Sequence, residues 1–248
     1  MDKKHELKKK KYTADPIKDP NDINRILDYF ISKKQYRNLL LFTMGVNFGL
    51  RCRDLLKLKF GGIMNIDGSI KSVVVVEEEK GKNTRVCYMN QFVIDAAKMY
   101  VDALVNSGYT INFNDYIFTS LSNSNSDKYY ETLHCKLSSS TGQPLNIKTH
   151  SNSHIGVNAV ENMLKKVINQ ELGIDIHAGT HLMRKTFAYQ VITNSPNSDW
   201  NKAIEYLQII LGLKSSAATI WYAGILGYNG EINKIKCKID FNNPVMYK

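Results

Sequence analysis

Apolar residues along this chain recur mainly three and four positions apart, which is the spacing of an amphipathic α-helix. The first such pattern predicts a helix from about residue 21, where Asn21 or Asp22 can act as the cap. The same spacing predicts further helices over residues 36–50, 53–58, 91–104, 157–168, 181–193, 199–211 and 215–223. We therefore expect a mostly helical protein.

Two stretches depart from the helical pattern. Four consecutive valines at 73–76 favour a strand, because β-branched side chains fit a pleated sheet. Gly81 to Asn83 predicts a turn, and residues 85–89 predict the returning strand of a hairpin. Residues 119–156 are rich in Ser, Asn and Thr and predict a long surface loop. The expected fold class is thus α+β, mostly helical, with a small antiparallel sheet.

The chain carries a net charge of +10, from 33 Lys and Arg against 23 Asp and Glu. A basic surface favours a polyanionic partner such as nucleic acid, although charge alone is weak evidence for one. The sequence has no apolar run near the ~20 residues that a membrane helix needs. Its charged N-terminus lacks the apolar region of a secretory signal. We expect a cytoplasmic protein with no membrane partner.

The four cysteines, Cys52, Cys87, Cys135 and Cys237, are scattered and form no CxxC pair. This spacing favours neither a zinc site nor a disulfide framework, and we expect reduced structural thiols. No Walker loop, HExxH or GxGxxG motif is present. The sequence therefore gives no reason to expect a metal or another cofactor.

Phosphodiester transfer without a metal needs fixed positive charge, a nucleophile, a base and an acid. Candidates for each occur in four segments: GLRCRDLLKL (49–58), EKGKNTRVCYM (79–89), THLMRKTFA (180–188) and LGLKSSAATIWYAG (211–224). Together these segments resemble the tyrosine recombinase, or phage integrase, family over roughly residues 20–225. The resemblance implies the catalytic-domain fold of that family and site-specific DNA recombination through a 3′-phosphotyrosyl intermediate.

The resemblance also implies a role for each matching residue. Arg51 and Arg184 are expected to clamp the scissile phosphate, and Tyr222 is expected to attack it. His181, three positions before Arg184 and on the same helical face, is expected to act as the base for Tyr222. Lys80, at the predicted hairpin turn, is expected to protonate the leaving 5′ oxygen.

Other residues are an alternative to, or support for, the expected site. Lys82 lies in the same predicted turn and is the alternative to Lys80 as the acid. Asp54 resembles the acidic residue that braces the site in the family. Lys185 stands where the family often has His or Arg.

One position departs from the family pattern. Leu213 occupies the place of a His or Trp that normally hydrogen-bonds the phosphate or packs on the tyrosine. Loss of one donor from a preorganised anion site costs about 10²–10³ in rate, so a lower activity is expected. The neighbouring Lys214 offers a partial replacement only if it points toward the site.

The resemblance divides the chain into a basic lead-in (1–19), a catalytic domain (20–225) and a tail (226–248). We expect the lead-in to be mobile or to lie on a partner, and the tail to pass between protomers. The usual N-terminal core-binding domain is missing, so we expect a full-length short member, with a truncated one as the alternative. The expected partners are double-stranded DNA, three further copies in a homotetramer, and an accessory DNA-bending protein.

Two other functions remain open from the sequence. A type IB topoisomerase shares the site chemistry but usually has Lys where this chain has His181, and it keeps the histidine that Leu213 replaces. A DNA-binding regulator could keep the fold without strand transfer, and Leu213 is the residue that favours this alternative. The preferred prediction is a recombinase of the integrase or invertase type.

Overall fold

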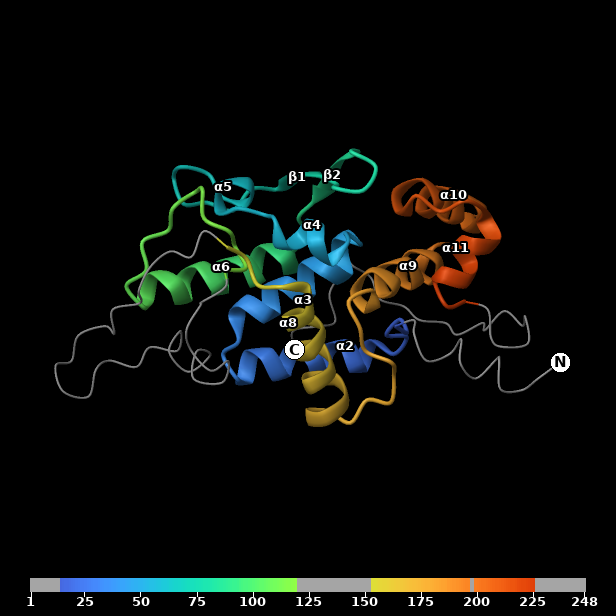
Figure 1. Cartoon of the computed structure of the whole chain (residues 1–248), viewed down its shortest axis with the longest axis horizontal. Coiled ribbons are helices and arrows are strands. Elements are labelled where there is room, and N and C mark those ends of the chain that lie inside the picture. The colour runs from blue at the N-terminus through green and yellow to red at the C-terminus, as the bar shows by residue number, and fades with distance from the viewer. Residues whose placement is uncertain (1–13, 120–152, 197–198, 226–248) are drawn as a thin grey trace. The chain divides into compact units, whose positions relative to one another are not determined.

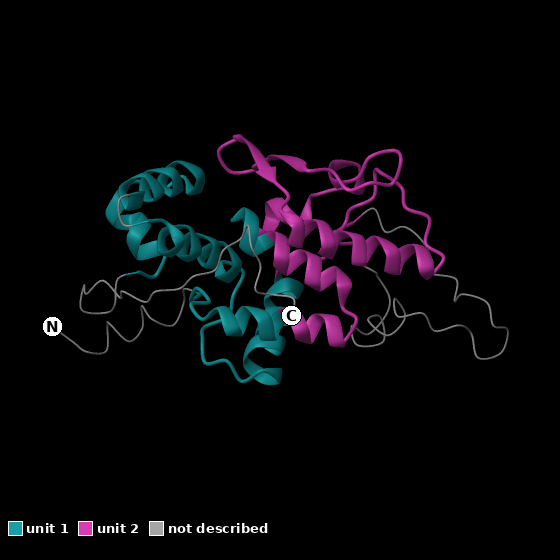
Figure 2. Ribbon diagram, turned by 180° about the vertical axis from the view of Figure 1, so that it is seen from behind, with its two compact units in different colours: residues 1–26, 45–51, 158–248 teal, residues 27–44, 52–157 magenta. Residues whose placement is uncertain are grey.

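The computed structural model describes residues 14–119, 153–196 and 199–225. The chain divides into two compact units, which are coloured separately in Figure 2. Unit 1 comprises residues 1–26, 45–51 and 158–248, and unit 2 comprises residues 27–44 and 52–157. The chain therefore passes between the units more than once, and helices α2 and α3 each contribute residues to both.

The described chain consists of helices and one hairpin (Figure 1). In chain order they are α2 (Pro20–Ser32), α3 (Tyr36–Phe48), α4 (Cys52–Leu56), α5 (Phe60–Ile63), β1 (Val73–Glu77), β2 (Thr84–Tyr88), α6 (Gln91–Asn106), α8 (Val157–Lys165), the π-helix η1 (Lys166–Glu171), α9 (Leu182–Asn194), α10 (Trp200–Leu211) and α11 (Ser216–Tyr222). The predicted mostly helical α+β fold is confirmed. Within the described residues, the sequence pattern did not predict the single turn of α5 or the change from α to π geometry at η1, because both are too short to show a period.

Strands β1 and β2 pair antiparallel, with Val73 opposite Tyr88 and Glu77 opposite Thr84. Alternate residues of β1 are buried, so one face of this two-stranded sheet packs on unit 2 and the other faces solvent. The connecting turn, residues 78–83, contains Gly81 at φ 104° and Lys82 at φ 52°. The predicted hairpin is therefore present, and its turn spans three more residues than the sequence indicated.

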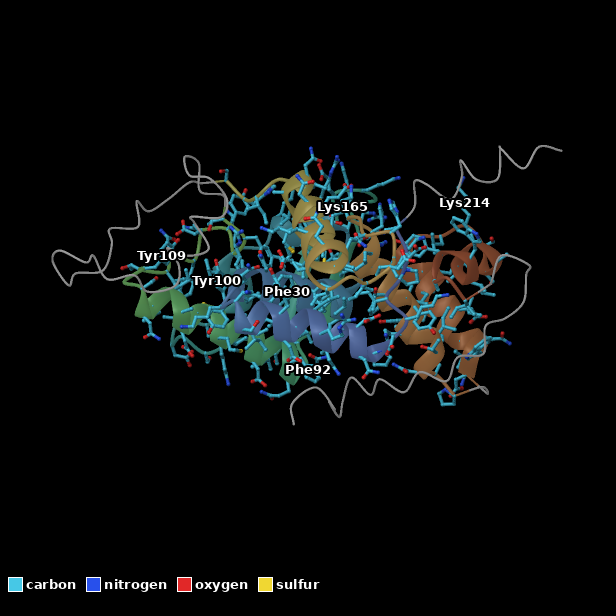
Figure 3. All side chains as sticks on the ribbon, turned by 90° about the horizontal axis from the view of Figure 1, so that it is seen from below. Phe30, Phe92, Tyr100, Tyr109, Lys165 and Lys214 are labelled. Atoms are coloured by element: carbon cyan, nitrogen blue, oxygen red, sulfur yellow. The ribbon has the colours of Figure 1, made fainter. Side chains whose placement is uncertain are left out.

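Pairs of aromatic residues connect elements within the core of unit 2. The ring of Phe30 lies 6.1 Å from that of Phe42, and the ring of Phe60 stacks 6.2 Å from that of Tyr100. The Tyr100 hydroxyl donates a hydrogen bond of 3.0 Å to the carbonyl of Ile117. Figure 3 labels Phe30 and Tyr100 among the side chains of this core. The first ring contact joins α2 to α3, the second joins α5 to α6, and the hydrogen bond joins α6 to the segment that follows it.

In unit 1, helix α9 is the central element. Nine consecutive residues from Leu182 to Gln190 are buried, so α9 has no solvent-facing stripe over its first turns. Its second half packs with α10 and α11 in one apolar cluster, whose buried members are Phe187, Ala188, Tyr189, Ile192, Ile204, Leu207, Leu211, Ala223 and Ile225. A polar side chain of such a buried helix is held in place where it forms a hydrogen bond inside the protein, because breaking a buried hydrogen bond costs free energy.

Residues 14–18, which belong to the expected basic lead-in, pack within unit 1. The backbone N–H of Ile17 donates to Thr186 Oγ1 at 2.9 Å, and the backbone N–H of Asp15 donates to the carbonyl of His177 at 2.9 Å. Ala14 and Ile17 are buried. The expectation of a mobile or partner-bound lead-in is therefore wrong for these residues, because two apolar side chains and two hydrogen bonds hold them on their own unit.

Several expected features lie outside the described residues. These are the lead-in before residue 14, the tail at 226–248, most of the loop expected at 119–156, and Cys135 and Cys237. Cys52 and Cys87 are described, and both are buried free thiols. Within the described ranges, no helix is both long enough and apolar enough to cross a lipid bilayer.

Candidate active site

Arg184 lies in the first turn of α9 and is almost completely buried, with 3% of its surface exposed. Its Nη1 donates to the carbonyl of Gly49 at 2.7 Å, and its Nη2 donates to the carbonyl of Leu211 at 3.1 Å. The first carbonyl follows the end of α3, and the second belongs to the last residue of α10. Carbonyls at helix C-termini lack partners in their own helix and carry partial negative charge, so they suit a guanidinium.

The conformation and surroundings of Gly49 require a glycine at this position, two residues before the first arginine of the motif. Its φ is +58°, in the left-handed region that side chains disfavour, and a Cβ there would overlap the ring of Phe187. This backbone turn ends α3, presents the Gly49 carbonyl to Arg184, and starts the short link through Arg51 to α4. The GLR and HxxR motifs are thus joined by a hydrogen bond.

Tyr222 and His181 contact each other across unit 1. Tyr222 is the last residue of α11, and His181 immediately precedes the first residue of α9. The distance from His181 Nδ1 to the Tyr222 hydroxyl is 3.3 Å. The structure therefore brings together two residues that are 41 positions apart and that the sequence had paired as base and nucleophile.

Burial and nearby positive charges together determine the protonation of this pair. Burial raises the pKa of Tyr222 above its ordinary value, while a hydrogen bond from Arg184 and the charges of Arg184 and Arg51 act in the opposite direction. Partial burial lowers the pKa of His181, and the charges of Arg184, Lys185 and Arg51 lower it further. At neutral pH the phenol is therefore protonated and the imidazole is neutral, which is the state a proton acceptor needs.

Lys185 follows Arg184 on α9 and is also buried. Its Nζ lies 5.3 Å from the ring centroid of Trp221 and 5.5 Å from that of Tyr222. Burial lowers the pKa of Lys185, and the charge of Asp15 partly opposes this effect. Sequence reasoning placed Lys185 among the supporting residues but gave no contact for it, and it missed Trp221, whose only signal was its position beside the tyrosine.

Leu213 packs on the apolar cluster of unit 1, as does Tyr222. Helix α10 ends at Gly212, whose φ of +61° allows the left-handed cap, and Ser215 caps α11 by accepting from the N–H of Ala218 at 3.2 Å. Leu213 lies in this short link and offers no side-chain donor. Lys214, labelled in Figure 3, is exposed.

The expected acid and brace residues lie in unit 2. Lys80 is exposed in the turn between β1 and β2, and Lys82 lies in the same turn. Asp54, in α4, is buried, and its Oδ1 accepts from the backbone N–H of Glu79 at 3.0 Å. Asp54 therefore anchors the turn beside Lys80, which is a local bracing role.

Two ion pairs add to the anchoring of this turn. Lys57 Nζ lies 3.3 Å from Glu79 Oε2, and the largely buried side chains of Arg85 and Glu78 form an ion pair of 3.3 Å. The backbone N–H of Glu78 also donates to the carbonyl of Asn83. The turn is thus tied at both ends while its tip stays exposed.

The residues expected in the site therefore fall into two sets. Arg51, His181, Arg184 and Tyr222 belong to unit 1, and Lys80 belongs to unit 2. Across the described ranges, no group of three or more His, Cys, Asp or Glu side chains could hold a metal ion. The chemistry available in unit 1 is that of a phenol beside a neutral imidazole and fixed guanidinium groups.

Comparisons with known proteins give the family and the fold. No curated protein matches the sequence. The structure matches that of XerA recombinase with a TM-score of 0.57 and 20% identity, over 88% of this chain and 63% of that one. It matches a post-cleavage complex of XerH site-specific recombinase, bound to palindromic difH substrate, with a TM-score of 0.52 and 16% identity, over 86% of this chain and 50% of that one.

A dimer of lambda integrase residues 75–356, bound to a COC′ core site, matches with a TM-score of 0.50 and 15% identity, over 91% of this chain and 64% of that one. The chain thus spans between half and two thirds of the length of these recombinases. The model of the phage integrase family matches residues 18–226, which is most of the chain and includes every candidate residue above. The protein belongs to the phage integrase family.

Proposed function

We propose that this protein is a site-specific DNA recombinase that cuts and rejoins strands through a covalent bond to Tyr222. The observation that carries the proposal is the contact of 3.3 Å between the Tyr222 hydroxyl and His181 Nδ1. A neutral imidazole at that distance can accept the phenolic proton as the oxygen attacks phosphorus. Double-stranded DNA is the proposed substrate, and the net charge of +10 favours its binding.

In the proposed reaction, the phenolic oxygen of Tyr222 forms a bond to the scissile phosphorus, and the bond from phosphorus to the 5′ oxygen breaks. His181 receives the phenolic proton, and Lys80 gives a proton to the leaving oxygen. Arg184 and Arg51 neutralise charge on the non-bridging oxygens. A 5′ hydroxyl from a second strand then attacks the phosphotyrosine and releases Tyr222. The two proton transfers run in reverse in this step.

Strand exchange needs two duplexes, so we propose that a homotetramer forms on DNA, with an accessory DNA-bending protein as a further partner. The tail at 226–248, which is outside the described residues, is proposed to pass between protomers. Deleting it should abolish the tetrameric complex while monomer binding to a single site persists. Native gel mobility on one-site and two-site DNA measures both properties.

The test of the covalent step uses nicked suicide substrates that carry candidate sites from the flanking DNA, with no metal added. The expected product is a protein–DNA adduct that survives SDS and is lost in Tyr222→Phe. Tyr206→Phe is the matched control, because Tyr206 is an exposed tyrosine on α10 of the same unit. An adduct that persists in Tyr222→Phe contradicts the assignment of the nucleophile.

A second function, a DNA-binding regulator without strand transfer, is favoured by one observation. Leu213 packs on apolar residues and supplies no donor at a position where the family normally has one. Binding to the same DNA with no adduct, even from the nicked substrate, supports the regulator. Adduct formation by the wild-type protein excludes it.

A further inference from the structure

The ammonium group of Lys185 contacts two consecutive aromatic residues at the end of α11. Only 7% of the Lys185 surface is exposed, yet its Nζ lies within 5.5 Å of the centroids of both rings. Trp221, in contrast, has 59% of its surface in solvent. A largely exposed tryptophan therefore covers a buried lysine, and the reaction proposed above uses neither residue.

Contact with both rings constrains the rotation of α11. Successive side chains on a helix point about 100° apart, since 3.6 residues make one turn. A cation on the faces of Trp221 and Tyr222 therefore fixes how the last turn is rotated about its axis. Helix α11 has only seven residues and cannot set this orientation by its own hydrogen bonds alone.

We propose that Lys185 is a positioning residue for Tyr222, and that its ammonium group, held between the rings of Trp221 and Tyr222, keeps the phenol opposite His181 before cleavage. The proposal rests on the function proposed above. In this role Lys185 does not contact DNA and transfers no proton. Its effect is on the geometry and the electrostatics of the pair formed by Tyr222 and His181.

The charge of Lys185 also acts on His181, which lies four positions earlier at the start of α9. Burial is the largest cause that lowers the pKa of His181, and the charges of Arg184, Lys185 and Arg51 lower it further. The opposing charge near Lys185 is Asp15, in the packed lead-in segment. Loss of the Lys185 charge should therefore raise the pKa of His181, and a substitution that keeps the charge should leave it near the wild-type value.

The kinetic test compares Lys185→Met, which removes the charge and keeps the length, with Lys185→Arg, which keeps the charge. Lys214→Met is the control, because it removes one exposed charge from the same unit. Adduct formation from a nicked suicide substrate is measured from pH 5 to 9, and DNA affinity is measured separately. We expect Lys185→Met to slow cleavage on the order of 10- to 100-fold, because a displaced nucleophile reacts more slowly. We expect its affinity for DNA to equal that of Lys214→Met.

The pH profile, compared between Lys185→Met and Lys185→Arg, tests the effect of the Lys185 charge on His181. Cleavage requires neutral His181, so its rate falls as the pH drops through the pKa of that residue. In Lys185→Met this acid limb should move to higher pH, and in Lys185→Arg it should return toward the wild-type position. A wild-type rate and an unshifted acid limb in Lys185→Met overturn the proposal.

A second measurement needs no catalytic activity. In a Trp200→Phe background Trp221 is the remaining tryptophan, so its fluorescence reports the nearby amine. The emission should change with pH as Lys185 loses its proton below the ordinary lysine range, and Lys185→Met should abolish that change. An identical titration with and without Lys185 overturns the proposal. If the wild-type protein forms no adduct, the proposed function fails, and this titration still decides whether the contact exists.

Discussion

The guanidinium of Arg184 and the carbonyl of Gly49 form a hydrogen bond of 2.7 Å across 135 positions of the sequence. Gly49 supplies the carbonyl only because its backbone adopts φ +58°, and the space beside it is filled by the ring of Phe187. This relationship makes a glycine and an arginine from separate motifs depend on each other. The first two predictions follow from it.

Gly49→Ala should destabilise the protein for two reasons, a strained φ and an overlap with Phe187. Gly173→Ala is the matched control, since Gly173 has φ +62° but no atom within 4 Å of an added Cβ. We expect the control to cost about 1 kcal/mol from backbone strain and Gly49→Ala to cost roughly 2–4 kcal/mol. Urea unfolding measures both. Equal losses contradict the packing role of Gly49.

Arg184→Lys should be far from conservative, because an ammonium group cannot hold the carbonyls of Gly49 and Leu211 in a planar fork. One buried carbonyl then loses its partner, at a cost of about 1–3 kcal/mol in unfolding free energy. Cleavage should fall on the order of 10²- to 10³-fold. Unfolding and adduct assays on the same preparation separate the loss of stability from the loss of cleavage. An unchanged unfolding free energy contradicts the role of the two hydrogen bonds from Arg184.

His181 should make the protein less stable in mildly acidic solution. Its pKa is lowered in the folded state, so between that value and the ordinary value of about 6.5 the unfolded chain binds more protons. Stability should therefore fall as the pH drops through this window and be unaffected by His181 above it. His181→Asn should flatten the dependence in that window. An unaltered slope of unfolding free energy against pH contradicts the lowered pKa.

Asp54→Ala should loosen the turn that carries Lys80. The backbone N–H of Glu79 donates to Asp54 Oδ1, so its amide hydrogen should exchange with solvent faster in the variant. Asp54→Asn keeps an acceptor oxygen and should retain most of the protection. Hydrogen exchange at Glu79 measures the effect, and equal exchange in both variants contradicts the bracing role.

Lys80→Met should slow cleavage more than Lys82→Met if Lys80 is the acid. A substrate with sulfur in place of the scissile 5′ oxygen releases a thiolate, which needs no proton from the protein. That substrate should restore cleavage by Lys80→Met to within about ten-fold of the wild type. If the sulfur substrate restores cleavage by Lys82→Met but not by Lys80→Met, Lys82 is the acid.

Much of the fold follows from local patterns in the sequence. The helix α6 and the hairpin were predictable because their apolar residues keep one period over several turns or along a whole strand. The turn η1 and the packing of residues 14–18 were not, since π geometry leaves no separate period and the lead-in owes its place to contacts with α9.

In the candidate site, the side chains were predictable from the sequence and the backbone groups were not. His181 and Tyr222 are side chains that a motif can show, and the structure places them 3.3 Å apart. The carbonyls of Gly49 and Leu211 are backbone groups that every residue carries, so no residue type marks them. The catalytic roles themselves stay predictions, because geometry gives proximity and not reactivity.

The hydrogen bond from Ile17 to Thr186 spans 169 positions, and the one from Arg184 to Gly49 spans 135. The entropy of closing a loop rises with the logarithm of its length, and chains with many such distant contacts fold slowly. Unit 1 consists of three separate stretches of the chain, which must pack together before α9 is buried. On a ribosome that synthesises the chain from its N-terminus, the phenol of Tyr222 therefore meets His181 only after residue 222 has emerged, so shorter nascent chains should lack the pair of residues proposed to react with DNA.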